Sequence, residues 1–217
     1  MAKTEKLLKS AFDRLLNHYG PRNWWPGDTP FEVMVGAILT QNTNWKNVEK
    51  AIENIKRKKL LDPKKLLDLQ PSMLADLIRP AGFFRLKTKR LRNFLKYYID
   101  NYDGSDERMA GQSLDTLRLE LLAINGVGRE TADSILLYAL NKPIFVIDAY
   151  TKRILLRHSL CSEEAEYVEL QELFTDSLSE DWRLYNEYHA LIVEVAKEFC
   201  KKNPKCDECP LNGWNDS

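Results

Sequence analysis

Two groups of residues in this chain of 217 residues have types and spacings that could do chemistry. One is the pair of glycines in Gly126-Val127-Gly128, which is followed one helix later by Asp148. The other is a C-terminal group of cysteines, Cys200, Cys206 and Cys209. A glycine-rich turn that leads into a helix can hold an anion, a carboxylate can stabilise positive charge, and closely spaced thiols can bind a metal.

The glycine pair separates two stretches of helical periodicity, residues 114–123 and 129–140, which predicts a helix, a tight hairpin and a second helix. The free N–H groups at the start of the second helix suit a backbone phosphate, which carries no base identity. We therefore expect Gly126, Gly128 and Arg129 to contact DNA. The turn alone does not decide this, because a Gly-x-Gly turn with a glycine C-cap also serves ordinary helix packing.

A helix-hairpin-helix followed by an aspartate at the head of a further helix resembles the endonuclease III superfamily of DNA glycosylases. The resemblance implies that the partner is double-stranded DNA with a damaged base, which must leave the duplex before its N-glycosidic bond can be reached. Breaking that bond builds positive charge on the sugar, so the resemblance assigns Asp148 the catalytic role. A plain N-cap, worth about 1 kcal/mol, is the alternative and is compatible with catalysis.

Two further DNA contacts follow from the resemblance. Gln41, in Leu39-Thr-Gln-Asn-Thr43, matches a glutamine that fills the gap left by the extruded nucleotide, although a capped loop would explain the run equally well. Phe83 stands where the superfamily has a loop that pushes a side chain into the stack of the opposite strand.

Charge patterning adds a candidate DNA-facing patch. From Arg79 to Lys96 the chain carries seven basic residues and no acidic one. A solvated helix face usually explains such a run, but the missing acids and the adjacent aromatic pair favour a surface that faces phosphates beside an apolar wedge. We expect Lys87 and Arg90 to bind DNA.

The residue two positions after Gly128 distinguishes superfamily members that also cleave the DNA strand from those that only remove the base. Members that also cleave the strand carry a lysine there, whose amine forms a Schiff base with the sugar. This chain has Glu130, so the resemblance implies a monofunctional enzyme that leaves an abasic site.

Trp24-Trp25-Pro26, Trp45 and Glu130 are similar to the 3-methyladenine DNA glycosylase III group, whose base pocket is aromatic. An alkylated purine is cationic, and an indole face attracts a cation. The resemblance therefore implies a base pocket formed by Trp24, Trp25, Pro26, Trp45 and Glu130, although paired tryptophans also serve simple packing. A uracil or thymine mismatch glycosylase is the alternative within this class, and a non-catalytic helix-hairpin-helix DNA-binding protein is the alternative outside it.

The cysteine tail predicts a metal site. Cys200, Cys206 and Cys209 lie where the endonuclease III superfamily has a four-cysteine [4Fe-4S] loop, but the first gap is one residue short and the fourth cysteine, expected near Asn215, is absent. Three possibilities follow: a cluster with an unusual fourth ligand, which we favour in a structural role, a zinc site, or a relic without metal.

The whole-chain composition limits the class of protein. With 32 basic and 32 acidic residues the formal net charge is zero, so only a local patch could support DNA binding. No apolar run approaches the ~18 residues that span a bilayer, and the N-terminus lacks a signal region. We expect a cytoplasmic monomer.

Helical periodicity without any strand-period segment predicts an all-α fold. The resemblance implies two helical lobes, residues 22–138 with the hairpin, and residues 1–21 plus 139–217 with the cysteine loop. Residues 101–112 are polar and rich in turn formers, so we expect a surface connection there.

Overall fold

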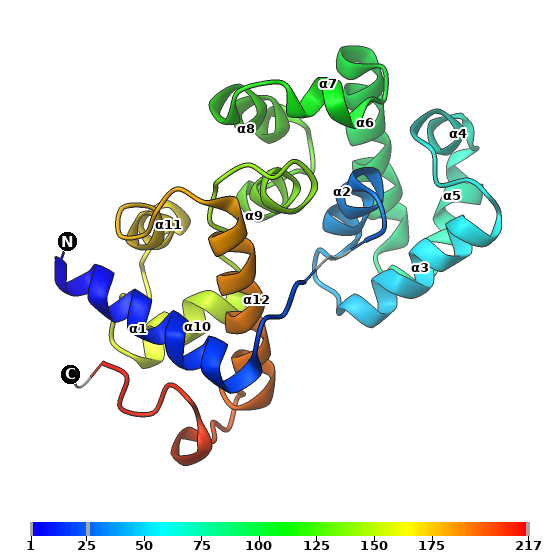
Figure 1. The fold of residues 1–217 in the computed structure, drawn as a ribbon. Coiled ribbons are helices and arrows are strands. Elements are labelled where there is room, and N and C mark those ends of the chain that lie inside the picture. The colour runs from blue at the N-terminus through cyan, green and yellow to red at the C-terminus, as the bar shows by residue number, and fades with distance from the viewer. Residues whose placement is uncertain (1, 25–26, 216–217) are drawn as a thin grey trace. The chain divides into compact units, whose positions relative to one another are not determined.

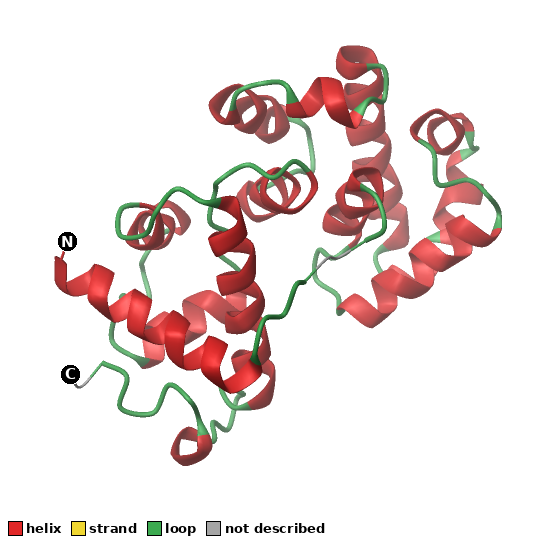
Figure 2. Ribbon diagram, in the orientation of Figure 1, coloured by secondary structure: helices red, strands yellow, loops and turns green. Residues whose placement is uncertain are grey.

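The computed structural model describes residues 2–24 and 27–215, apart from the side chain of residue 2. Within these ranges the chain consists of helices and loops, with no strand (Figures 1 and 2). The predicted all-α class is confirmed. No helix in the described part of the chain is long and apolar enough to cross a membrane.

The chain folds as two compact units, Trp25–Lys142 and a second unit made of Met1–Trp24 with Pro143–Ser217. The resemblance implies boundaries at residues 22 and 138, and local hydrogen bonds account for the small differences from them in the structure. Residues 22 and 23 stay with the second unit because their N–H groups donate to the Glu187 carboxylate. Lys142 stays with the hairpin unit because its ammonium donates to the carbonyls of Ala110 and Gln112.

The hairpin unit is built around α2, a helix that is buried on nearly every side. Pro30 occupies its first turn, and Thr29 caps it by accepting the N–H of Glu32 at 3.2 Å. Helix α2 packs against α3, α6 and the segment that follows the hairpin. The elements of this unit are α2 (Pro30–Leu39), α3 (Trp45–Arg57), α4 (Pro63–Asp68), α5 (Pro71–Leu77), η1 (Arg79–Ala81), α6 (Phe84–Tyr102), α7 (Asp106–Ala110), α8 (Leu114–Ala123), α9 (Arg129–Ser134) and η2 (Ile135–Ala139).

Residues 101–112 are not the irregular connection that their composition predicts. Helix α6 continues to Tyr102, and α7 begins after Ser105, whose hydroxyl accepts the N–H of Arg108. Met109 is fully buried within this stretch. The polar residues therefore cap and anchor a short helix, which composition alone does not distinguish from a loop.

The second unit consists of α1 (Ala2–Tyr19), α10 (Ala149–Arg157), α11 (Tyr167–Thr175), α12 (Trp182–Glu198) and the short turn η3 (Cys206–Glu208). Helix α12 packs against both α1 and α10. Trp214 in the tail is 2% exposed, and its indole N–H donates to the Leu7 carbonyl of α1 at 2.7 Å.

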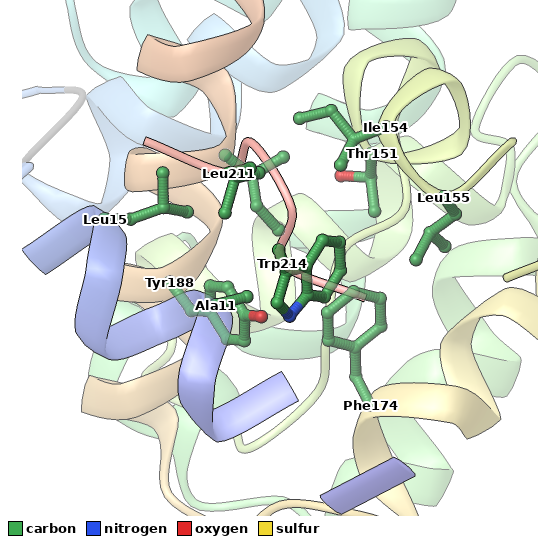
Figure 3. Close-up of a pocket in the computed structure, with 10 residues that line it drawn as sticks. Ala11, Leu15, Thr151, Ile154, Leu155, Phe174, Tyr188, Leu211 and Trp214 are labelled. Carbon is green, nitrogen blue, oxygen red and sulfur yellow. The ribbon is translucent and has the colours of Figure 1, made fainter. Parts of the chain in front are cut away.

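A void of about 10 Å³ remains beneath α10, where Trp214 and Leu211 of the tail meet side chains of α1, α11 and α12 (Figure 3). It is at the lower limit for a single water molecule, so this region is packed core rather than a base-binding pocket. Thr151 of α10 lines the void, which ties the first turn of that helix to the core.

Candidate functional site

The two hairpin glycines differ in conformation. Gly126 has φ +100°, a region that favours glycine, whereas Gly128 is extended at φ −95° and ψ 177° and caps α9. Only Gly126 therefore has a backbone conformation that other residues rarely adopt. The predicted helix over 129–140 is also altered, since α9 ends at Ser134 and a π-helical turn, η2, follows.

The space around the two glycines differs as well. A Cβ on Gly126 would lie 2.3 Å from Cγ and 2.9 Å from Cδ of Arg90, whereas a Cβ on Gly128 would meet nothing within 4 Å. Gly126 is thus required by packing and conformation, and Gly128 leaves the backbone at the start of α9 bare. Bare backbone is what a phosphate needs in order to approach N–H groups closely.

Gln41 connects the end of α2 to the hairpin. Its Nε2 donates to the Gly126 carbonyl and to Oγ1 of Thr131, each at 3.0 Å, and its Oε1 accepts a hydrogen bond from Nη1 of Arg90. Asn93 adds a bond from Nδ2 to the Asn125 carbonyl at 2.9 Å. The structure brings Gln41, Arg90 and Gly126 into one network, and their contacts with DNA stay predictions.

The prediction that Lys87 binds DNA is wrong. Its side chain is buried, and its ammonium donates to the carbonyls of Leu39 at 2.8 Å and Ala81 at 2.7 Å. Burial, assisted by the charge of Arg90, lowers the pKa of Lys87 to about 8. Lys87 joins the ends of two helical segments instead of facing phosphates.

The candidate patch is smaller than the charge run indicates. Arg92 also turns inward, where its guanidinium donates to the carbonyls of Leu67 and Leu69. The side chains of Arg85, Lys89 and Lys96 are exposed on α6. A helix of this kind distributes its basic residues over all faces, so only some of them reach solvent.

Phe83 has the exposure that a wedge requires. It is 68% exposed at the start of α6 and has φ 44°, directly after Gly82 at φ 69°. A positive φ is unusual for a bulky residue, and a large exposed aromatic is costly in water unless a partner covers it. Leu86, one turn further, is 47% exposed and extends the apolar surface. Insertion of Phe83 into DNA stays a prediction.

Asp148 caps α10 with one carboxylate oxygen. Oδ1 accepts the N–H of Thr151 at 2.7 Å and its hydroxyl at 2.9 Å, while Oδ2 lies 3.6 Å from Nε2 of His189. Burial acts to raise the pKa of Asp148, but the charge of His189 and the Thr151 hydrogen bonds outweigh it, so the pKa is lowered. With 15% of its side chain exposed, Asp148 is an ionised carboxylate in a largely enclosed position.

The backbone that leads into Asp148 is held by α11. The hydroxyl of Tyr167 accepts the N–H of Ile147 at 3.3 Å, and Nε2 of Gln171 donates to the Phe145 carbonyl at 2.6 Å. Together with the cap on Thr151, these bonds fix the chain on both sides of the carboxylate.

His189 of α12 is the residue at this site that sequence reasoning missed. It is 4% exposed, and its ring stacks on Trp24 with centroids 6.3 Å apart and planes inclined by 25°. The Phe145 ring meets the imidazole in a T-shaped arrangement, with ring centroids 6.3 Å apart. In the sequence His189 lies among apolar residues at a core-facing position, so its signal is that of an ordinary buried histidine.

The predicted base pocket is only partly described. Trp24 stacks on His189, and His189 in turn contacts Asp148. Trp25 and Pro26 fall outside the described residues. Trp45 is half-buried at the start of α3, with its ring against Gly36 of α2, and Glu130 is exposed in the first turn of α9. The pocket stays a prediction.

The three tail cysteines line one cavity of about 240 Å³, together with Arg157 and His158. Nη1 of Arg157 donates to Sγ of Cys200 at 3.1 Å. Burial raises the pKa of the Cys209 thiol, and the neighbouring Cys200 and Cys206 raise it further. The thiols thus share one neighbourhood, but no group of three or more His, Cys, Asp or Glu side chains in the described ranges is arranged to hold a metal ion.

Comparison with known proteins gives consistent results. Residues 35–180 match the HhH-GPD superfamily base excision DNA repair protein family. A Methanocaldococcus jannaschii protein, named provisionally as a DNA repair glycosylase, is 53% identical over 95% of this chain and 94% of its own length. Endonuclease III of Thermotoga maritima is 33% identical over 88% of this chain and 84% of its own. The crystal structure of H. pylori 3-methyladenine DNA glycosylase (MagIII) bound to 1,N6-ethenoadenine is similar with a TM-score of 0.73 and 31% identity, over 90% of this chain and 97% of that one.

Proposed function

The chain belongs to the HhH-GPD superfamily of base excision DNA repair proteins, as the hairpin and Asp148 predicted, and we propose that it is a monofunctional DNA glycosylase that removes alkylated purines. The family accounts for DNA as the partner and for excision of a base. The hydrolytic mechanism, the lesion and the roles of individual residues are the proposal.

One observation carries the mechanism: Asp148 is an ionised carboxylate fixed at the head of α10. When the glycosidic bond breaks, its electron pair leaves with the base and the sugar becomes cationic. The carboxylate stabilises that cation and accepts a proton from the water molecule that adds to the sugar. Because Asp148 is ionised before the substrate binds, no proton must be removed from it first.

Glu130 supports hydrolysis without strand cleavage. A carboxylate cannot form the imine that a lyase needs, and Glu130 is an exposed residue of α9. Lys87, whose lowered pKa could indicate a nucleophilic amine, is enclosed by two carbonyl acceptors and is 1% exposed. It is therefore a structural lysine.

The assignment to alkylated purines rests on the similarity to a 3-methyladenine glycosylase and on aromatic residues near the predicted pocket. A methylated purine is already cationic, so it is a good leaving group and is attracted by indole faces. We propose that Trp24, Trp25, Pro26, Trp45 and Glu130 contribute to the base pocket.

We propose that DNA is bound by a further set of residues: Gln41, Phe83, Arg90, Gly126, Gly128 and Arg129. Gly128 offers bare backbone to a phosphate, and Phe83 is exposed for insertion. Gln41 and Arg90 already bond the hairpin, so they act first by holding it in shape.

We further propose that Cys200, Cys206 and Cys209 hold a [4Fe-4S] cluster with a structural role. Three thiols line one cavity and are of the type that ligates such a cluster, although in the described ranges they are not arranged as a metal-binding group and no fourth ligand is identified. Bound there, the cluster would cross-link the tail to α12. Visible absorption with iron and sulfide analysis of anaerobically purified protein tests this, and bound zinc or no metal would contradict it.

The substrate assignment is tested with duplexes that contain one lesion each: 3-methyladenine, 7-methylguanine, uracil, or thymine opposite guanine. Products are divided into two portions, one treated with alkali to cleave abasic sites and one left untreated. We expect release of the methylated purines and strand cleavage only after alkali. Release of the pyrimidines alone would contradict the alkylation proposal, and cleavage without alkali would contradict monofunctional hydrolysis.

A further inference from the structure

We propose that His189 is a positioning residue for Asp148, holding the second carboxylate oxygen in a fixed direction in its ionised form. This inference deepens the proposed function and rests on it. His189 comes from α12, far along the chain from the hairpin and from Asp148.

The two oxygens of Asp148 have separate tasks. Oδ1 alone supplies the cap of α10, since it accepts both the N–H and the hydroxyl of Thr151. A serine, threonine or asparagine would cap equally well with a single oxygen. Capping therefore leaves Oδ2 unexplained, and Oδ2 is the oxygen that faces Nε2 of His189 at 3.6 Å.

The imidazole contacts two aromatic rings. The Trp24 ring stacks on it, and the Phe145 ring meets it in a T-shaped arrangement with an interplanar angle of 76°. At 4% exposure the ring has little freedom to turn. A rigid group beside Oδ2 restricts the rotation of the carboxylate, and fixed direction is what stabilisation of a developing cation requires.

At 3.6 Å, Nε2 of His189 lies beyond hydrogen-bond distance of Oδ2, and the contact is an ion pair when the imidazole is protonated. A histidine at this distance acts through its charge when it is protonated and through its ring N–H when it is neutral. Three charged groups on α1, α10 and α12 interact with other partners. Arg153 of α10 donates to the Ala196 carbonyl, Glu187 accepts the N–H groups of residues 22 and 23, and Asp13 of α1 acts on Tyr188.

The test compares His189→Leu, His189→Gln and the control Asn186→Leu. Asn186 is 5% exposed on the same helix, and among the described residues its Nδ2 has no hydrogen-bond partner, so its replacement changes the core without removing a hydrogen bond of that group. Circular dichroism and the thermal midpoint identify any variant that fails to fold.

The first readout needs no substrate: the carboxyl carbon of Asp148 is followed by NMR through an acid titration. We expect the pKa of Asp148 to rise in His189→Leu and to stay at the wild-type value in Asn186→Leu. An unchanged titration in His189→Leu overturns the proposal. This result stands even if the wild-type protein releases no base, in which case it is the proposed function that fails.

The second readout is the single-turnover rate of base release as a function of pH, with DNA affinity measured in parallel. For His189→Leu we expect about a tenfold to hundredfold slower step at neutral pH, an acid limb shifted to higher pH, and unchanged affinity. His189→Gln should regain most of the rate, because its amide N–H can reach Oδ2, but keep the shifted limb because it is uncharged. Equal loss in both His189 variants would indicate a packing role and contradict the proposal.

Discussion

Alanine substitutions at Gly126 and Gly128 distinguish two properties of the hairpin: its contribution to folding stability and its affinity for DNA. At Gly126 a methyl group must occupy φ +100° and also displace the aliphatic part of Arg90, which lies 2.3 Å away. The backbone strain costs about 1–2 kcal/mol and the overlap about 1–3 kcal/mol. We expect Gly126→Ala to lose roughly 2–5 kcal/mol of folding free energy, a fall of about 5–15 °C in the thermal midpoint.

Gly128→Ala should behave in the opposite way. Its extended backbone accepts any residue, and nothing lies within 4 Å of the new methyl, so stability should change by no more than about 0.5 kcal/mol. The methyl would instead meet an approaching phosphate. Loss of one charge-assisted hydrogen bond, worth about 1.5 kcal/mol, predicts at least about tenfold weaker binding.

The two variants are measured by thermal unfolding and by fluorescence anisotropy with duplex DNA at fixed salt. Gly111→Ala is the matched control, because Gly111 belongs to the same unit, has φ −68°, and a new Cβ would lie 3.4 Å from the Arg108 carbonyl oxygen, an ordinary contact distance. It should change neither quantity appreciably. Wild-type affinity in Gly128→Ala, or wild-type stability in Gly126→Ala, would refute the reasoning.

Two other substitutions test the corrected roles on α6. The folded-state pKa of Lys87, about 8, lies below its ordinary 10.5, so the unfolded state binds more protons between these values and wild-type stability rises with pH there. Denaturant unfolding at several pH values should show that the free energy of unfolding of the wild type, relative to that of Lys87→Met, rises by up to about 1.4 kcal/mol per pH unit. The same pH dependence in both proteins would contradict this expectation. Phe83→Ala should keep the fold, because 68% of the side chain is exposed. The rate of base release should fall more on duplex DNA than on single strands, since only a duplex has a stack for the ring to enter. An equal fall on both substrates would argue against a wedge.

Local sequence signals located most of the fold. Proline in the first turn with a capping oxygen directly before it is such a signal, and the structure shows it at α2 and α4. Asp148 was assigned its role through the family resemblance, and its alternative role as an N-cap depends on residues within one turn. These signals involve short sequence separations, so no knowledge of the tertiary fold is needed.

The failures share one cause, which is dependence on distant parts of the chain. A lysine in a basic helix has the same local pattern whether it faces solvent or, as Lys87 does, the carbonyl of a residue 48 positions away. His189 likewise acquires significance only when α12 packs against α10. The distinct requirements at Gly126 and Gly128 depend on where Arg90 lies, and spacing within the hairpin carries no information on that.

The proposed mechanism depends most directly on the charge of Asp148, and Asp148→Asn removes that charge while asparagine retains the cap to Thr151. The decisive measurement is the single-turnover rate of base release for this variant on the duplex that the wild type processes best, with DNA affinity and thermal midpoint measured beside it. We predict a rate lower by about 10²–10³-fold at unchanged affinity and stability. Base release at the wild-type rate by Asp148→Asn would contradict the proposed mechanism.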